Sequence, residues 1–263
     1  MLTKLFTKKT FLLPMIFTGA VISSFPSQAI SLSTYRIYLG PDQRSASFIV
    51  YNKTPDGEQC SISLVHNNFD ENGIMTPVAR DVLPENSAKP WVRFSPKNFT
   101  VEGLEPQSIR FTLRRKANSE PAEYRSYLRI DCDKIEKENA SSKSGTNTAK
   151  LTIQPKLIQQ IPIIARTGKL NATLEFTKMK VIAGALHIDL VRQGNRSVYG
   201  KIELINKKTD EVITFKKNIS LYTETTNKQV KLATADIPID QLLVRFTENA
   251  SYGGDIVVER SVL

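Results

Sequence analysis

The chain has 263 residues, of which 36 are Lys or Arg, 26 are Asp or Glu, two are Cys and two are His. A hydrophobic fraction of 40% with 24% charged residues is typical of a globular protein and excludes a wholly disordered or collagen-like chain. Two Cys and two His cannot supply a Cys/His zinc site of four ligands without carboxylates, so we expect no metal site and no cofactor.

The first 29 residues are predicted to be a secretory signal peptide. The N-terminal region is positively charged through Lys4, Lys8 and Lys9, and residues 11–25 are mostly apolar. Residues 27–29 are Ser-Gln-Ala, which places small residues at the −3 and −1 positions of a signal-peptidase site. A membrane anchor is the alternative, but the apolar stretch is short and two prolines interrupt it. Cleavage after Ala29 would export the mature chain.

The remaining positive charge does not by itself indicate a nucleic-acid partner. Cleavage removes three Lys and no acidic residue, which lowers the formal net charge of +10 by three. Export argues against nucleic acid, and no basic helix with interleaved aromatic residues is present. No apolar run of about 18 uncharged residues follows the N-terminus, so the body of the chain is not a helical membrane protein.

The mature chain has the pattern of many short strands separated by turns. In the first half the candidates are 45–51, 60–65, 92–94, 108–113 and 124–130, and in the second half 185–191, 201–205, 211–215, 229–232 and 255–259. Spacings near ten residues, without a sustained helical period, predict an all-β protein of immunoglobulin-like sandwiches. Since one such domain takes about 100 residues, we expect two, 30–166 and 167–263.

The two cysteines are predicted to form a structural disulfide. Export places Cys60 and Cys132 in an oxidising compartment, and a redox-active pair would be expected to show a C-x-x-C motif. Cys60 opens one predicted strand and Cys132 follows another. These would be the third and sixth strands of the domain, which are antiparallel neighbours in the immunoglobulin fold. Their Cα atoms should therefore lie within bridging range, roughly 4.4–6.8 Å.

A polar segment followed by a long apolar strand interrupts the even spacing. Residues 133–150 are polar and low in complexity, which predicts a mobile loop. Residues 151–165 predict a long strand, and its apolar residues of one parity are Leu151, Ile153, Leu157, Ile161 and Ile163. Two prolines on this strand favour an edge that pairs with another chain, although a core strand would show the same alternation.

Four segments, in order along the mature chain, resemble the periplasmic pilus (fimbrial) chaperones of the PapD-like family. They are Tyr35-Arg36-Ile37-Tyr38-Leu39-Gly40; Phe94-Ser95-Pro96-Lys97-Asn98-Phe99 with Gln107-Ser108-Ile109-Arg110; Glu123-Tyr124-Arg125-Ser126-Tyr127-Leu128; and Asn195-Arg196-Ser197-Val198-Tyr199 with Tyr252-Gly253-Gly254. Each motif is short, and it is their order, together with the domain sizes and the signal peptide, that makes the resemblance specific.

The resemblance implies two immunoglobulin-like domains at an angle, with a subunit-binding cleft between them. Such chaperones lend an edge strand to an incomplete pilin, which is donor-strand complementation, and deliver the subunit to an outer-membrane usher for fibre assembly. Leu151, Ile153, Leu157 and Ile161 would then fill the pilin groove. Arg36, expected at the surface, would bind the terminal carboxylate of the pilin. The same edge would also permit self-association.

Two departures from the family pattern concern this cleft. A lysine often lies four residues before the arginine that closes the donor strand, but that position here, counted from Arg166, is Pro162. The positions of the acidic partners of that arginine hold Arg125 and Ser251. We therefore expect a changed carboxylate anchor and a changed set of contacts between the domains.

Two other classes of protein were considered. A secreted β-sandwich pilus subunit or adhesin would share the export signal, the strands and the disulfide, but it should carry a longer N-terminal extension than Ile30–Ser33 before the first strand. For an enzyme, His66 and His187 belong to no known catalytic pattern. No catalytic residue is assigned, and the protein is not expected to be an enzyme.

Overall fold

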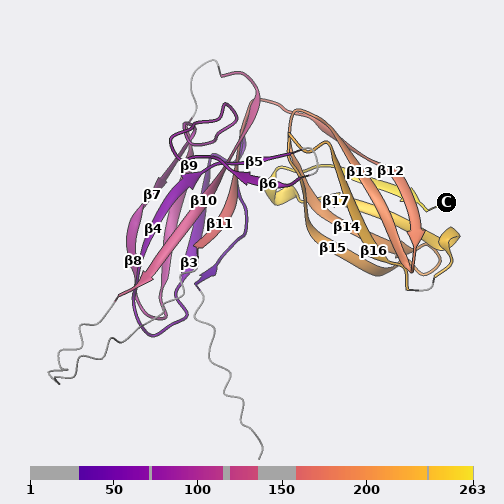
Figure 1. Cartoon of the computed structure of the whole chain (residues 1–263), viewed down its shortest axis with the longest axis horizontal. Helices are drawn as coiled ribbons and strands as arrows, with labels where there is room; N and C mark the ends of the chain where they lie inside the picture. The colour runs from indigo at the N-terminus through magenta and orange to yellow at the C-terminus, as the bar shows by residue number, and fades with distance from the viewer. Residues whose placement is uncertain (1–29, 71–72, 115–118, 136–157, 236, 263) are drawn as a thin grey trace, which may run out of the picture.

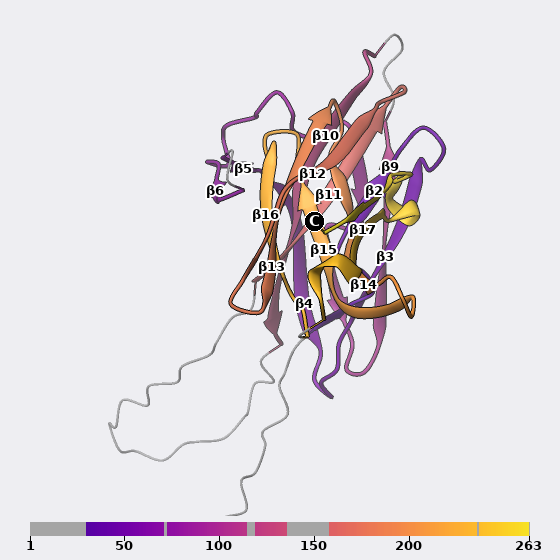
Figure 2. The ribbon, with the colours of Figure 1, turned by 90° about the vertical axis from the view of Figure 1, so that its right-hand side faces the viewer.

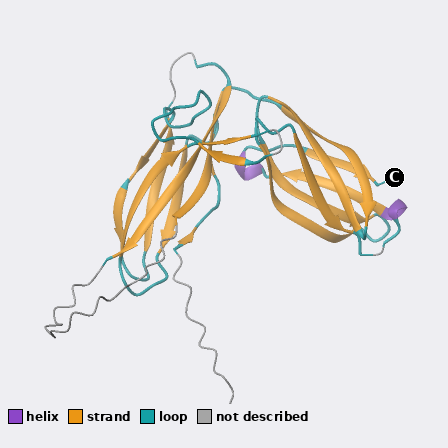
Figure 3. Ribbon diagram, viewed as in Figure 1, coloured by secondary structure: helices purple, strands orange, loops and turns teal. Residues whose placement is uncertain are grey.

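The computed structural model describes residues 30–70, 73–114, 119–135, 158–235 and 237–262. They form two β-sandwiches joined at an angle (Figure 1), and Figure 3 shows how little helix the chain contains. The predicted fold class, two all-β sandwich domains, is confirmed. In the described residues the helical elements are two 3-10 turns, η1 (Ile239–Gln241) and η2 (Ala250–Tyr252), and no helix there is long and apolar enough to cross a membrane.

The first domain packs a sheet of order β1-β3-β9-β7 against a sheet of order β2-β11-β10-β4-β8. The four-stranded sheet contains β1 (Ser31–Leu32), β3 (Ser45–Tyr51), β9 (Pro106–Leu113) and β7 (Val92–Ser95). The five-stranded sheet contains β2 (Ile37–Leu39), β11 (Ile158–Thr167), β10 (Ala122–Lys134), β4 (Glu58–Val65) and β8 (Asn98–Val101). A small hairpin joins β5 (Asn67–Phe69) to β6 (Met75–Pro77).

Alternating apolar residues build the core of the first domain. In β9 every second residue is buried, and in β4 the same period holds over its first six residues. The largest fully buried side chains include Phe48, Ile109, Phe111, Leu128 and Ile163, which come from both sheets. A period of two places successive side chains on opposite faces of a sheet, so only one face of each sheet contributes to this core.

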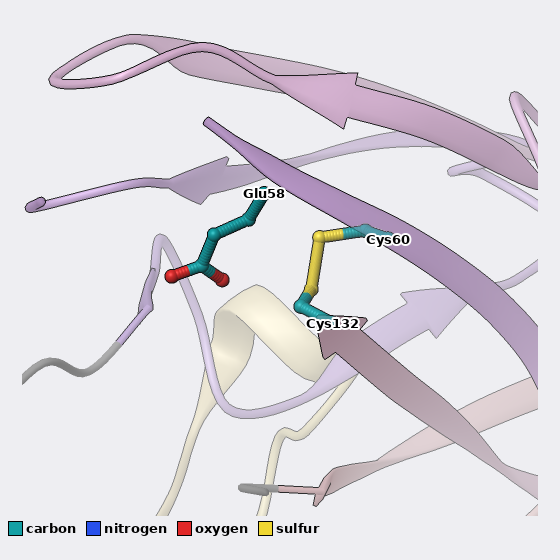
Figure 4. Close-up of side chains that lie close together, drawn as sticks. All are labelled: Glu58, Cys60 and Cys132. Atoms are coloured by element: carbon teal, nitrogen blue, oxygen red, sulfur yellow. A yellow bond between two sulfur atoms is a disulfide. The ribbon is translucent and has the colours of Figure 1, made fainter. Parts of the chain in front are cut away.

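The predicted disulfide is present within the five-stranded sheet (Figure 4). Cys60 on β4 and Cys132 on β10 are direct partners in the antiparallel register, and their Cα atoms lie 4.1 Å apart, slightly closer than predicted. Glu58 lies beside the bridge; burial raises the pKa of its carboxyl group, Asp133 raises it further and Lys134 opposes this. Because both sulfur atoms are bonded, this group of three residues has no thiolate to offer a metal ion.

Strand β11 differs from the predicted edge strand in one respect. It pairs with β10 along its whole length, but on its other side β2 pairs with it in parallel, from Ile163 to Ala165. Within the described residues this side of β11 is therefore without a strand partner at 158–162 and at 166–167. The first two residues of the predicted loop, Asp133 and Lys134, belong to β10 and pair with β4, and residues 136–150 of that prediction lie outside the described residues.

The second domain, which is nearer the viewer in Figure 2, packs a sheet of order β12-β13-β16 against a sheet of order β15-β14-β17-β18. Their bounds are β12 (Ala172–Ile182), β13 (Ala185–Gly194), β16 (Asn227–Ala233), β15 (Glu211–Leu221), β14 (Val198–Asn206), β17 (Leu242–Glu248) and β18 (Val257–Ser261). Its core is separate from that of the first domain. The chain passes from β11 to β12 through the four residues 168–171.

Candidate functional site

One face of the five-stranded sheet of the first domain lies against the second domain. On β10, Leu128 points into the core, whereas the neighbouring residue Tyr127 is buried outside it. On β11 the same alternation separates Ile163, in the core, from Ile164, which is buried outside it. Arg125 is two positions from Tyr127 on the same strand, so its side chain lies on the same non-core face. From there it forms an ion pair with Glu224 of the second domain.

Arg36 lies on this face, immediately before β2. Its side chain is buried, with 3% exposure, so the expectation of a surface arginine is wrong. The guanidinium carbon lies 4.4 Å from the ring centre of Tyr199 and 5.7 Å from that of Tyr222, and Nη1 donates a long hydrogen bond of 3.4 Å to Ser220 Oγ. All three residues belong to the second domain.

Arg36 forms no ion pair with a carboxylate in the described part of the chain. A buried charge without a partner is costly, because burial removes its hydration and cation–π contacts restore only part of that free energy. Most of its guanidinium N–H groups also remain available as donors, since a single long hydrogen bond uses one of them. The chemistry of this position therefore suits an anion.

A second arginine, Arg125, joins the domains through a bidentate ion pair. Its Nη1 and Nη2 atoms donate to Glu224 of the second domain at 2.8 and 2.7 Å, and Asn86 Nδ2 donates to the same carboxylate at 2.8 Å. Burial alone would raise the pKa of Glu224, but the hydrogen bonds and charge of Arg125 hold it below its ordinary value. The sequence-based expectation was an acid at position 125; the residue there is Arg125, and the acid of its ion pair is Glu224 of the second domain.

The β5–β6 hairpin reaches from the first domain toward the second (Figure 1). Its Phe69 ring lies 4.8 Å from the ring of Tyr222, and the Arg125 guanidinium lies over both rings, at 4.9 and 4.3 Å. A cation placed over aromatic faces is attracted by their electron density, and more strongly when water is excluded. The hairpin thus adds an aromatic cover to the ion pair between the domains.

Arg166 forms the third contact between the domains. Its Nε donates to Glu123 Oε2 at 2.8 Å, and its two terminal nitrogens donate to the carbonyl groups of Ser197 and Gly253, both at 2.9 Å. Glu123 in turn accepts the backbone N–H of Ser197 at 3.0 Å. The sequence-based search for the partner of Arg166 considered positions 125 and 251 and missed Glu123, which pairs with it across β10 and β11.

The Tyr-Gly-Gly segment at 252–254 is where the backbone of the second domain meets the first domain. The Tyr252 hydroxyl is 2.9 Å from Thr34 Oγ1, so a hydrogen bond joins the domains here. Gly253 has a left-handed φ of +68°, and a Cβ added to it would lie 2.3 Å from the hydroxyl oxygen of Tyr38. Only glycine fits this position without a shift of its neighbours.

His66 is buried at the same interface, near the Arg125–Glu224 pair. Burial is the main cause that lowers the pKa of its imidazole, and the charge of Arg125 lowers it further, while Glu224 acts in the opposite direction. The ring is therefore neutral at pH 7.

The predicted donor residues are only partly within the described chain. Leu151, Ile153 and Leu157 lie outside the described residues. Ile161 does not present its side chain to a partner, because it is 3% exposed and packs in the core of the first domain. The expectation that this parity faces away from the core is therefore wrong at 161 and 163. The exposed apolar residue on the described part of the strand is Ile158, with 39% exposure.

Sequence reasoning found Arg36 and Arg166 but missed the acids and aromatic residues that surround them. Glu123 and Glu224 are ordinary charged residues in the sequence, and only the pairing of β10 with β11 and the docking of the second domain bring them to their arginines. Tyr127 gave one usable signal, since it follows Arg125 by two residues on one strand and must share its face.

No family model matches the chain, and no curated protein matches it. Among solved structures it is similar to the Pseudomonas aeruginosa CupB2 chaperone, with 13% identity over 89% of this chain and 100% of the other, and a TM-score of 0.49. It is also similar to the Salmonella enterica SafA pilin–SafB chaperone complex, with 11% identity over 91% and 99% of the chains and a TM-score of 0.49. The Acinetobacter baumannii CsuC–CsuE chaperone–tip subunit complex gives 11% identity over 88% and 97% of the chains and a TM-score of 0.48. Likenesses this distant do not decide what this chain binds.

Proposed function

We propose that the protein is a periplasmic chaperone that binds pilus or fimbrial subunits by donor-strand complementation and delivers them to an outer-membrane usher. The signal-peptide pattern and the ordered motifs support this proposal. The observation that carries it is Arg36, a buried arginine without a carboxylate partner in the described residues, which lies beside Pro162, the last residue of the open stretch 158–162 of β11. A strand added at that edge would end near a group suited to its terminal carboxylate.

The edge of β11 supplies the main-chain part of this recognition. Residues 158–162 pair with β10 on one side, and their other side is free within the described chain. An extended client segment can hydrogen-bond there. Side chains of Leu151, Ile153 and Leu157, which precede the described part of the strand, must then turn into its groove, unlike Ile161 and Ile163 of the same parity. Burying three such side chains contributes about 1.5–3 kcal/mol each before the costs of association are subtracted. The same edge would let a second copy of the chain pair with it when no client is present.

Purification from the periplasm tests the proposal. The tagged protein should recover a small β-rich subunit, and the double variant Ile153→Asp, Leu157→Asp should lose it while remaining folded and exported. As a matched control, Val212→Asp with Val257→Asp changes two exposed apolar residues of the second domain and should keep the subunit. If instead the first double variant unfolds, these residues are core and the proposal fails.

The alternative function, a pilus subunit or adhesin, predicts a different result from the same preparation. A subunit would polymerise with itself when purified alone, whereas a chaperone should stay monomeric or form a limited oligomer. Size-exclusion chromatography of the purified protein at rising concentration separates the two.

A further inference from the structure

The turn between β15 and β16 contacts the first domain directly. Within its residues 222–225, the Tyr222 ring lies beside the guanidinium groups of Arg36 and Arg125. Glu224, two residues further on, forms the ion pair with Arg125. Whatever holds the backbone of this turn therefore also determines where an aromatic ring and a carboxylate meet the two arginines.

A second turn, residues 194–197 at the junction of β13 and β14, is also docked on the first domain. The Ser197 carbonyl accepts a hydrogen bond from Arg166 at 2.9 Å, and the Ser197 N–H donates to Glu123 at 3.0 Å. Both partners belong to the first domain, where they pair with each other. The two turns are separated in the chain by all of β14 and β15, yet they reach the same interface.

Arg192, near the end of β13, joins the two turns. Its side chain is buried, with 4% exposure. Its Nε donates to the Tyr222 carbonyl at 3.2 Å, and its Nη2 donates to the Thr223 carbonyl at 2.9 Å. Its Nη1 donates to the Gly194 carbonyl at 2.8 Å and to the Arg196 carbonyl at 3.1 Å. Four hydrogen bonds from one guanidinium thus hold the backbones of both turns.

The geometry and the charge of an arginine both suit this position. A guanidinium offers five N–H donors in a planar fork, so one side chain can satisfy carbonyl groups on two sides, whereas a lysine ammonium donates from a single point. Arg192 forms no ion pair with a carboxylate among the residues that the structure describes. Burial lowers the pKa of Arg192, and the charges of Glu123 and Glu224 offset part of that effect. The two acids of the domain interface thus also favour the charged form of Arg192.

We propose that Arg192 is a positioning residue of the domain interface, which holds the turns 194–197 and 222–225 in the arrangement that meets the first domain. All four of its acceptor carbonyls belong to the second domain, so it acts on the first domain through the turns that it holds. The inference rests on the proposed function in that the cleft for the subunit lies between the two domains that Arg192 aligns. The alignment itself is measurable without any client.

A double-mutant cycle in the full mature protein tests this role. Arg192→Lys keeps the positive charge but replaces the fork with a single donor group, so it should release the turn 222–225 while the domain stays folded. The loss in urea midpoint caused by Glu224→Gln should then be at least halved in the Arg192→Lys background, because Glu224 no longer meets Arg125 in a fixed place. Arg192→Met, which also removes the charge, should give coupling of the same sign.

Glu259→Gln is the matched control for the cycle. Glu259 pairs with Arg245 across β17 and β18 in an exposed ion pair, and neither residue is an acceptor for Arg192. Its loss should be the same in both backgrounds, since independent sites contribute additively. Equal losses from Glu224→Gln in the two backgrounds would overturn the inference. Unfolding of the second domain in Arg192→Lys would also overturn it, because arginine would then be needed for the fold of the domain rather than for the interface.

Residual dipolar couplings of the backbone amides distinguish positioning from a loss of stability alone. In the unchanged protein both domains should fit one alignment, whereas in Arg192→Lys each domain should keep its own internal fit and the two alignments should diverge. A substitution that only lowers stability leaves both domains of the folded molecule in one alignment, and that result overturns the inference. Recovery of a client from the periplasm by the unchanged protein reads out the proposed function separately, so either can fail without the other.

Discussion

Tyr38 of the first domain touches Gly253 of the second so closely that a Cβ added at Gly253 would lie 2.3 Å from the Tyr38 hydroxyl oxygen. Both residues adjoin Arg166, whose guanidinium lies 5.2 Å from the Tyr38 ring and donates to the Gly253 carbonyl. The contacts among Tyr38, Gly253 and Arg166 thus fix the position of one domain on the other.

The first prediction tests this contact through Gly253→Ala. The added methyl group clashes with Tyr38. The new alanine must also keep the left-handed φ of Gly253, which alone costs about 1–2 kcal/mol. Gly184→Ala is the matched control, because Gly184 has a φ of +74° with open space around it. We expect Gly253→Ala to lower the free energy of unfolding by more than the control does. The excess should shrink when Tyr38→Ala is added, and an equal loss in the two single variants would show that the clash is relieved at no cost.

The second prediction concerns the Arg125–Glu224 pair. Glu224→Gln leaves the buried Arg125 charge without its counter-ion, which should cost about 2–3 kcal/mol of unfolding free energy. Glu259→Gln removes the partner of Arg245 in an exposed pair and should cost less than about 1 kcal/mol. Urea denaturation of both variants measures the difference, and similar small losses would mean that water reaches Arg125.

The third prediction is that acid weakens the interface. The pKa of His66 is lowered from its ordinary value of 6.5, so between these two values the unfolded chain binds more protons than the folded one. Stability should therefore fall as the pH drops below about 6.5. Glu224, whose pKa is lowered from 4.5, adds a second loss at lower pH. The charge of Arg125 adds to the lowering of the His66 pKa, and Glu224 offsets part of it.

Thermal midpoints measured between about pH 7.5 and 5 check this sign. His66→Gln should flatten the upper part of the pH dependence. A steeper loss in His66→Gln would contradict the assignment.

Much of the fold could be predicted because alternation and turn residues are local signals. The strand expected at 45–51 coincides with β3, and the disulfide joins the two strands predicted to be neighbours. The strands β12 and β17 were missed although Leu174 and Phe176, and likewise Leu242, Val244 and Phe246, alternate in the core. In β12 a register shift between Phe176 and Lys178 interrupts the alternation of buried and exposed residues, so the second half of the strand does not continue the pattern of the first.

The site was less predictable, since it depends on contacts between residues far apart in the chain. Alternation alone does not say which parity of a strand faces the core, and the wrong parity was chosen for Ile161. The burial of Arg36 follows from the docking of Tyr199 and Ser220, more than 160 residues away, and nothing near residue 36 signals it.

The fourth prediction concerns the disulfide. The bridge closes a span of 72 residues, and the chain-entropy model gives such a loop roughly 4 kcal/mol. The double variant Cys60→Ala, Cys132→Ala should lose about that much unfolding free energy. Reduction of the unchanged protein should lower its thermal midpoint to that of the variant, and a midpoint that reduction does not alter would show that the bridge contributes nothing.

The central claim, that β11 donates its edge to a client, is tested most directly by hydrogen exchange. Amide exchange is compared in the free protein and in the complex recovered from the periplasm, using peptides that span residues 151–162. Main-chain pairing with a client predicts slower exchange there on binding, with little change in the β4–β8 pair, which lies on the far side of the sheet. Unchanged exchange over 151–162 in a saturated complex would contradict donor-strand complementation by this edge.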